Sequence, residues 1–538
     1  MQGLMGTQPL TIGTIFDRMR TVYADGEVVD AFPSGAGRMT YGAIADRVLR
    51  LVTVLRDLGV QPGDRVGTFA SNSSRHLELY YAVPLVGAVL HMVNIRLHDD
   101  QLEYVVADAG DSVMFVDDDL VPRLGQVAAR MPSVRAFVRM GKGESPGIEG
   151  ILDGEQLVEN ASAATDLPEL DEHAACGMCH TSGTTGMPKA VVYSHRATYL
   201  HALAMCMVDS LAISERERIL PVVPLFHACG WGLPYAAPLT GADLVFAGAD
   251  CSPEALARIV EQERVTWAAA VPTIWTSLLP IAQAGTLDLS SLRVLGVGGS
   301  ATPRALMEAY DALGITILQI WGMTETTPVA AVSRPRRRHR DGSDAELLET
   351  RLKTGTILPG LEARICDPAT GEVLPWDGET VGELECRGPW VATDYWSHSG
   401  ASAAEKFHDG WLKTGDMAVM ESDGYFKIVD RSKDLVKSGG EWISSVELEG
   451  ACLAHPAVKE AAVVGVPSQK WDERPVVVVS VHDGQSVTLP ELRAFLGDRV
   501  AKWWLPDDVV VVDDVAKTSV GKYDKKAIRA QLAGRVLP

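Results

Sequence analysis

The sequence has few cysteines, few aromatic residues and little basic charge for its length. Its 538 residues include 8 cysteines, 6% Phe, Trp or Tyr, and 49 Lys and Arg against 70 Asp and Glu, a formal net charge of −21. Scattered cysteines in so long a chain indicate free thiols in a reducing compartment rather than a disulfide framework. The acidic balance argues against a protein that coats nucleic acid or an anionic membrane.

Long hydrophobic runs are also scarce. The longest, Tyr80 to Val93, contains Pro84 and His91 and is too short to span a bilayer. Met1 to Arg20 lacks the basic start and apolar stretch of a secretory signal. We therefore expect a soluble, cytoplasmic protein with no transmembrane segment and no nucleic-acid partner.

One cysteine cluster matches the pattern for covalent attachment of c-type haem. It reads Cys176-Gly177-Met178-Cys179-His180. No export signal accompanies it, and no second Cys/His pair lies nearby at zinc-ligand spacing. The segment runs directly into a glycine-rich loop, so we predict that its cysteines are buried residues of the preceding strand.

The chain is too long for one hydrophobic core, so at least two domains are expected. Short β-branched runs alternate with helical patterns, which is typical of an α/β fold. Around Thr354 to Gly388 glycines and prolines separate short strands, which predicts a β-barrel-like subdomain. We expect a large N-terminal domain (1–430) with two α/β subdomains and this β-barrel-like subdomain, and a small α+β C-terminal domain (431–538). Representative predicted strands are Arg65–Phe69, Trp267–Ala270, Glu362–Cys366 and Val476–Val481.

The segment Thr181-Ser182-Gly183-Thr184-Thr185-Gly186-Met187-Pro188-Lys189 has the composition of a phosphate-binding loop. Its glycines let the backbone approach an anion, its hydroxyls donate hydrogen bonds, and Lys189 adds a cation. It is not a Walker loop, because Lys189 is neither preceded by Gly nor followed by Ser or Thr.

Five ordered motifs resemble those of the acyl-adenylate-forming (AMP-binding) superfamily, which includes acyl-CoA synthetases, luciferases and peptide-synthetase adenylation domains. They are His180–Lys189, Trp321–Glu325, Lys413–Asp416, Asp430–Lys433 and Thr518–Lys522. The resemblance covers about residues 35 to 532 and is closest to medium- and long-chain fatty-acyl-CoA synthetases. It implies an ATP- and Mg²⁺-dependent ligase that adenylates a fatty or arylalkyl acid and transfers the acyl group to CoA.

The resemblance also implies roles for individual residues. Lys522 would be the catalytic lysine that contacts carboxylate and α-phosphate, and Mg²⁺ would be held through Glu325 and Thr184. Asp416 would accept the ribose hydroxyls with support from Arg431. The phosphates would be bound by Thr181, Ser182, Gly183, Thr184, Thr185, Gly186 and Lys189. Adenine would be framed by Gly298, Gly299, Ser300 and Trp321, with Gly322 and Thr324 in the same element.

The second half-reaction is implied by the C-terminal motifs. The loop from Lys437 to Ser445, with Gly440 and Trp442, is similar to the one that acyl-CoA synthetases swing into the site for CoA. The small domain would be mobile and rotate about a hinge near Lys433, withdrawing Lys522.

The acyl pocket is predicted at His227, Trp231, Val297 and Gly298. His227 stands where peptide synthetases usually place an aspartate for an α-amine, so an α-amino acid is disfavoured. His180, Ala190, Ala516 and Cys229-Gly230 depart from the family pattern, and the last pair puts the chain length in doubt. Other acceptors (a carrier protein, or nitrite in the diazotisation of an aryl amine) and a nucleotide-binding pseudoenzyme are the alternatives, and a homodimer is left open.

Overall fold

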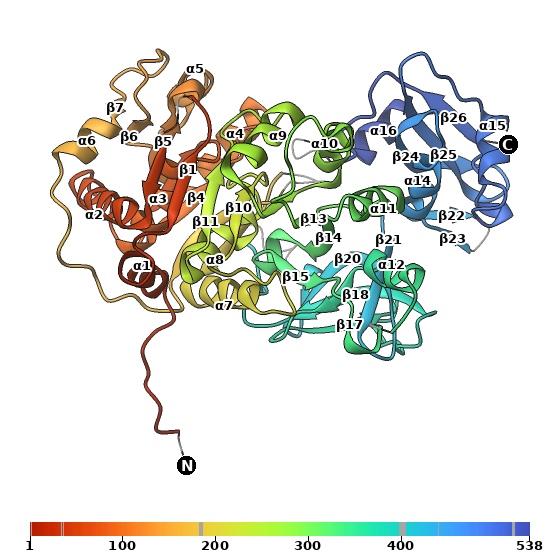
Figure 1. Cartoon of the computed structure of the whole chain (residues 1–538), viewed down its shortest axis with the longest axis horizontal. Coiled ribbons are helices and arrows are strands. Elements are labelled where there is room, and N and C mark those ends of the chain that lie inside the picture. Colours follow the sequence, from red (N-terminus) through yellow and green to blue (C-terminus); the bar gives the residue numbers. More distant parts are fainter. Residues whose placement is uncertain are drawn as a thin grey trace.

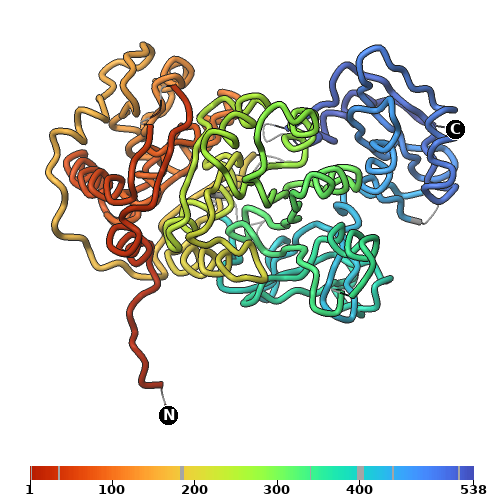
Figure 2. Tube along the Cα trace, in the orientation of Figure 1, coloured from red at the N-terminus to blue at the C-terminus, as the bar shows by residue number. Residues whose placement is uncertain are grey.

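The computed structural model describes residues 1, 3–33, 35, 37–181, 187–339, 341–396, 405–438, 441–518 and 522–537. The molecule is elongated, with the N-terminal third at one end and the C-terminal domain at the other (Figures 1 and 2). Three sheets organise it, and the candidate site lies where the first and second sheets meet Lys522 of the C-terminal region. None of the helices in the described ranges combines the length and apolar character needed to cross a bilayer.

The first sheet is parallel except at one edge. Its seven strands within the described residues follow the order β7-β6-β5-β3-β4-β8-β9, and β8 and β9 pair antiparallel. The strands are β3 (Arg65–Phe69), β4 (Val89–Met92), β5 (Asp111–Asp117), β6 (Ala136–Met140), β7 (Leu152–Asp153), β8 (Ala175–His180) and β9 (Ala190–Ser194). The helices of this region are α1 (Ile12–Thr21), α2 (Tyr41–Asp57), α3 (Ser74–Leu85), α4 (Asp99–Ala109), α5 (Val121–Gly125), α6 (Gly154–Asn160) and α7 (His195–Cys206).

The second sheet changes from parallel to antiparallel along its length. Strands β1, β11, β10, β12, β13 and β14 are parallel, and β15, β16, β21, β20, β18 and β17 continue the sheet antiparallel. The parallel part and its edge strand comprise β1 (Glu27–Asp30), β2 (Arg38–Thr40), β10 (Arg218–Pro221), β11 (Asp243–Phe246), β12 (Trp267–Ala270), β13 (Val294–Gly298) and β14 (Thr316–Gly322). The antiparallel part comprises β15 (Val329–Val332), β16 (Gly355–Ile357), β17 (Glu362–Cys366), β18 (Val381–Arg387), β19 (Phe407–His408), β20 (Trp411–Met420) and β21 (Tyr425–Arg431).

The helices around this second sheet follow the βα rhythm that the sequence indicates. They are α8 (Leu233–Thr240), α9 (Pro253–Glu263), α10 (Pro272–Ala284), α11 (Arg304–Ala312) and α12 (Asp344–Leu352). The region predicted to be β-barrel-like, Thr354 to Gly388, contributes β16, β17 and β18 to the antiparallel part. This part joins the parallel part where β15 pairs with β14.

The third sheet is separate and belongs to the C-terminal region. It contains β22 (Val436–Ser438), β23 (Glu441–Ile443), β24 (Val458–Ser468), β25 (Asp472–Val481) and β26 (Asp508–Val511), with helices α14 (Ser445–Leu453), α15 (Leu489–Leu496) and α16 (Lys525–Gln531). Consecutive valines in β24 (Val463 and Val464) and β25 (Val476 to Val479) point alternately to the two faces of the sheet and are buried on both. This sheet therefore has its own core.

The cysteine cluster is part of β8, as predicted. Cys176 and Cys179 are each 1% exposed, and both contribute to the main hydrophobic core. The seven cysteines whose state the structure describes are all free. The mixed α/β fold with a large N-terminal domain and a smaller C-terminal one is likewise confirmed.

Candidate active site

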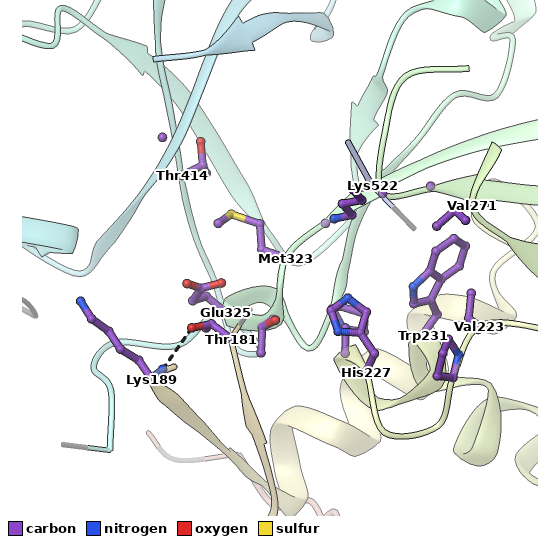
Figure 3. A pocket seen from close by; sticks show the side chains of 18 of the residues that line it. Thr181, Lys189, Val223, His227, Trp231, Val271, Met323, Glu325, Thr414 and Lys522 are labelled. Carbon is purple, nitrogen blue, oxygen red and sulfur yellow. Dashed lines mark hydrogen bonds between the residues drawn. The ribbon is translucent and has the colours of Figure 1, made fainter. Parts of the chain in front are cut away.

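A cavity of about 780 Å³ lies at the carboxyl ends of the parallel strands and is closed on one side by the C-terminal region. Figure 3 shows Thr181, Lys189 and Glu325 on one side of it and Val223, His227, Trp231 and Val271 on the other, with Lys522 between the two groups. The cavity therefore has a polar end and an apolar end, which meet at a lysine.

The polar end begins where β8 stops. The Thr181 amide donates to the Lys189 carbonyl (2.8 Å), and the Lys189 amide donates to Thr181 Oγ1 (3.2 Å), so the base of the phosphate loop is closed like a hairpin. The Lys189 ammonium lies 5.0 Å from the centre of the Tyr395 ring. Five predicted phosphate-binding residues lie outside the described residues: Ser182, Gly183, Thr184, Thr185 and Gly186.

Glu325 is the acidic group of this end and is 5% exposed. It sits in a short 3₁₀ helix, Thr324–Thr326, directly after β14. Its Oε1 accepts a hydrogen bond from the Tyr395 hydroxyl (2.5 Å), and its carbonyl accepts one from the Ala392 amide (2.7 Å). Among the described residues no group of three or more His, Cys, Asp or Glu could hold a metal alone. One carboxylate suits Mg²⁺, which takes much of its coordination from water and nucleotide phosphates.

Lys522 reaches the cavity from the C-terminal region. Its amide donates to Thr518 Oγ1 (3.3 Å), and its carbonyl accepts from the Thr518 amide (2.7 Å), so the backbone of Lys522 is attached to Thr518. The pKa of Lys522 is lowered from 10.5 to about 8, chiefly by burial and also by the nearby Arg431 guanidinium, while Asp416 opposes both effects. The cation is thus poorly solvated, and an anion that enters the cavity would pair with it strongly.

The side chains of Asp416 and Trp321 are hydrogen-bonded to each other and lie outside the cavity wall. The Trp321 indole N–H donates to Asp416 Oδ2 (3.0 Å), and Arg431 Nε lies 3.4 Å from Asp416 Oδ1. The Trp321 ring packs edge-on against Phe426, with ring centres 5.8 Å apart. Neither Trp321 nor Asp416 lines the cavity, although Gly322, Thr324 and Arg431 do.

The apolar end is formed by β13, α10 and the 3₁₀ helix Ala228–Gly232. Burial lowers the pKa of His227 to about 3, with Lys522 and Arg96 acting in the same direction, so its imidazole is neutral. Trp231 lies so close to Gly298 that a Cβ there would be 2.9 Å from the indole and 2.8 Å from the Ile320 carbonyl oxygen. Glycine at 298 therefore makes room for the indole, which narrows the acyl end.

Several predicted residues are not brought into the cavity wall. Val297 was predicted to face the substrate, but it is 0% exposed and packs in the core around Leu295 and Trp275, because side chains alternate along β13 and Gly298 takes the cavity side. Ser300 is exposed outside the wall, and Trp442 lies on β23, 42% exposed with Lys437 over its ring. Gly440 lies outside the described residues.

Several cavity residues were not singled out from the sequence; among them are Tyr395, Lys406 and Arg96, which carry charge or contact the predicted catalytic groups. Lys406 donates to the Thr414 carbonyl (3.0 Å), and its pKa is lowered by burial while Glu325 and Asp416 oppose that shift. None of the three belongs to a motif that stands out by composition. Lys406 precedes Thr414 by only eight residues, and the hairpin of β19 and β20 brings the two together. This short separation from the Thr414 to Asp416 motif was the one signal in the sequence that could have pointed to Lys406.

Comparisons with known proteins agree with this geometry. The family model described as "AMP-binding enzyme" matches residues 17–396, and "AMP-binding enzyme C-terminal domain" matches 447–522. A long-chain-fatty-acid–CoA ligase of Thermus thermophilus is 42% identical over 98% of this chain and 96% of its own length. A 3-methylmercaptopropionyl-CoA ligase of Ruegeria lacuscaerulensis is 39% identical over 98% of both chains.

The fold itself is shared with solved structures. A crystal structure of an anthranilate CoA ligase in complex with anthranoyl-AMP superposes with a TM-score of 0.86 at 24% identity, covering 97% of each chain. With a matching family model over most of its length and full-length relatives near 40% identity, this chain belongs to the AMP-binding enzyme family, and its homologues are AMP-forming CoA ligases.

Proposed function

We propose that this enzyme uses ATP, Mg²⁺ and CoA to convert an apolar carboxylic acid into its CoA thioester. The observation that carries the proposal is the position of Lys522. It lies between the polar end of the cavity, at Glu325, and the apolar end, at His227 and Trp231. An acid whose tail fills the apolar end would place its carboxylate beside Lys522 and beside the α-phosphate of a nucleotide that fills the polar end.

In the first half-reaction a carboxylate oxygen attacks the α-phosphorus of ATP, and the bond to the pyrophosphate oxygen breaks. Lys522 holds both anions in contact and offsets their charge, which is the main task of a phosphoryl-transfer site. When bound, Mg²⁺ neutralises charge on the phosphates; we assign Glu325 and Thr184 to hold it. Thr181 to Lys189 would hold the β- and γ-phosphates.

We further assign the nucleoside to residues around β14 and β20. Asp416 and Arg431 would bind the ribose, whose hydroxyls can donate to the lone pairs of Asp416 that Trp321 and Arg431 leave free. Gly299, Ser300, Gly322 and Thr324 would border adenine.

In the second half-reaction the CoA sulfur attacks the acyl carbon, the bond to AMP breaks, and the thiol proton passes to solvent. We propose 1–430 and 431–538 as the moving units, with the hinge at Lys433. Arg529 donates to the Lys433 carbonyl (3.0 Å) and pairs with Asp434 (2.7 Å), so the segment after the hinge is attached to the C-terminal unit. Rotation would withdraw Lys522 and bring Gly440 and Trp442 to the cavity.

The acyl end favours an acid without an α-amine. A neutral His227 and the indole of Trp231 offer no carboxylate to pair with an ammonium group. Because Trp231 narrows this end, we propose medium-chain or arylalkyl acids as better substrates than long chains. A homodimer and a cytoplasmic location stay predictions from the resemblance.

The test is ATP-dependent pyrophosphate release over a panel of fatty and arylalkyl acids, with and without CoA. Lys522→Ala should lose adenylation, and the matched control Lys526→Ala, on the exposed face of α16, should keep it. Thioester formation that requires CoA supports the proposal. Pyrophosphate release without any CoA-dependent thioester would indicate that the enzyme uses another acceptor, such as a carrier protein or nitrite. Absence of turnover with ATP and every acid would contradict the proposal.

A further inference from the structure

Two buried histidines outside the cavity wall join two carboxylates into one hydrogen-bonded chain. His91 Nδ1 lies 2.7 Å from Asp111 Oδ2, and His91 Nε2 lies 2.9 Å from His180 Nδ1. His180 Nε2 lies 3.2 Å from Asp108 Oδ2. The side chains of His91 and Asp111 are 0% exposed, and those of His180 and Asp108 are 6% and 12% exposed. Water is therefore largely excluded from the chain.

A proton count indicates that these four hydrogen-bonded side chains hold one proton more than two ionised carboxylates and two neutral imidazoles would. Both nitrogens of both rings are in contact, so the three contacts need three protons. Two neutral imidazoles carry two. If the four groups held only two protons, one of the three contacts would have no hydrogen atom between its two heavy atoms. Two lone pairs would then face each other in a buried position. Wherever the third proton resides, the four groups carry a net charge of −1 rather than −2.

The shorter contact with a carboxylate, 2.7 Å to Asp111 against 3.2 Å from His180 to Asp108, favours His91 as the site of the extra charge. Burial lowers the pKa of His180, with His91 acting in the same direction and Asp108 and Asp111 opposing. His91 is the ring closer to a carboxylate, and the other oxygen of Asp111, Oδ1, is buried without a hydrogen-bond partner in the described part of the chain. A cationic His91 stabilises that oxygen electrostatically.

The chain runs from the interior of the first sheet to the phosphate end of the cavity. His91 is on β4, Asp111 begins β5, and His180 ends β8, directly before Thr181. Asp108, at the end of α4, lines the cavity, and its carbonyl accepts a hydrogen bond from the Trp396 indole (3.3 Å). The neighbouring Tyr104 hydroxyl of α4 also lies within electrostatic range of Asp108. A change of charge in the chain therefore acts where the triphosphate would bind.

We propose that Asp111, His91, His180 and Asp108 form a proton-holding relay that makes nucleotide affinity depend on pH, with His180 as a positioning residue for Asp108 at the cavity wall. The inference rests on the proposed use of ATP. While the third proton is present, Asp108 accepts an N–H from His180 and repels phosphate less. When the third proton is lost as pH rises, the relay gains a negative charge beside the phosphates, and one of its three hydrogen bonds is lost. Nucleotide affinity then decreases.

The experiment measures Mg·ATP binding by calorimetry between about pH 6.5 and 9.5, without acid or CoA. It uses the full chain with Lys522→Met, which removes the cavity lysine whose pKa is about 8. Lys406 and Lys433 also line the cavity and have pKa values lowered by burial, so they stay in every variant and the comparison is between variants. In this background affinity should decrease about tenfold with rising pH, the loss expected for one charge-assisted hydrogen bond. His180→Leu should have the weak, high-pH affinity throughout. His180→Gln, whose amide can accept from His91 and donate to Asp108, should restore affinity at low pH. His173→Leu, at a 73% exposed histidine, should match the background.

A second measurement needs no variant at the relay. In ¹⁵N-histidine-labelled protein near neutral pH, nitrogen shifts should show one imidazolium hydrogen-bonded to one neutral ring. Two neutral rings would overturn the inference, as would a pH profile of His180→Leu parallel to the background or a failure of Gln to differ from Leu. If Mg·ATP does not bind to the unmodified chain, the proposed function fails instead.

Discussion

Lys522 should impose a pH limit on adenylation. A pKa of about 8 means that roughly 90% of the free enzyme carries the ammonium form at pH 7 and roughly 10% at pH 9. If the charged form is required, kcat/KM for ATP in the pyrophosphate assay is constant below pH 7 and decreases about tenfold for each pH unit above 8. The direction follows from burial, which disfavours the charged lysine.

Lys522→Arg is the decisive variant, because a guanidinium stays protonated throughout this range. Its rate should be lower than that of the unmodified enzyme, since the fork and the ammonium place their charge differently. The decrease above pH 8 should shrink from about tenfold per pH unit to the smaller decrease, about tenfold in total, that is expected of the His91–His180 relay. Lys526→Arg, at an exposed position, should keep the original profile. A decrease of about tenfold per pH unit that persists in Lys522→Arg, or a profile of the unmodified enzyme that stays flat to pH 10, would refute the assignment.

Three further substitutions test the cavity. Trp231→Ala should open the acyl end, so that each added methylene of the acid lowers KM up to about fourfold until the new space is filled, measured over a homologous series; an unchanged preference would contradict it. Tyr395→Phe should weaken Mg²⁺ affinity about tenfold in a Mn²⁺ titration followed by electron paramagnetic resonance, because Glu325 loses its hydroxyl donor (2.5 Å); unchanged or tighter binding would contradict it. Gly298→Ala should displace Trp231, because the Ile320 carbonyl cannot yield, and should lower thermal stability by about 1–3 kcal/mol; unaltered unfolding would contradict it.

The elements of the fold could be predicted well from local sequence, and contacts between distant residues could not. Trp267–Ala270 and Glu362–Cys366 were predicted with the bounds that the structure has, because β-branched or small apolar residues between turn signals are a local property. Lys522 and Glu325 share a cavity through the packing of two domains, and the sequence indicated that only through resemblance.

The errors and omissions at the site have physical causes. Val297 was predicted at the acyl pocket together with Gly298, but it packs in the core, because the alternation of a strand places neighbouring side chains on opposite faces. Tyr395 contacts Glu325 across a long stretch of chain, and no local pattern marks it. His180 was visible as a departure from the family pattern, yet its meaning depends on His91, which lies on another strand.

The separation of the third sheet from the second makes the enzyme modular. The nucleotide and acyl ends of the cavity are built on one continuous second sheet together with the edge of the first, whereas Lys522 belongs to a unit with its own core. The residues that select the acid and the lysine proposed for adenylation therefore belong to different units. A chimaera that joins this N-terminal unit to the C-terminal unit of a relative should inherit its acid preference from the former and its turnover from the latter.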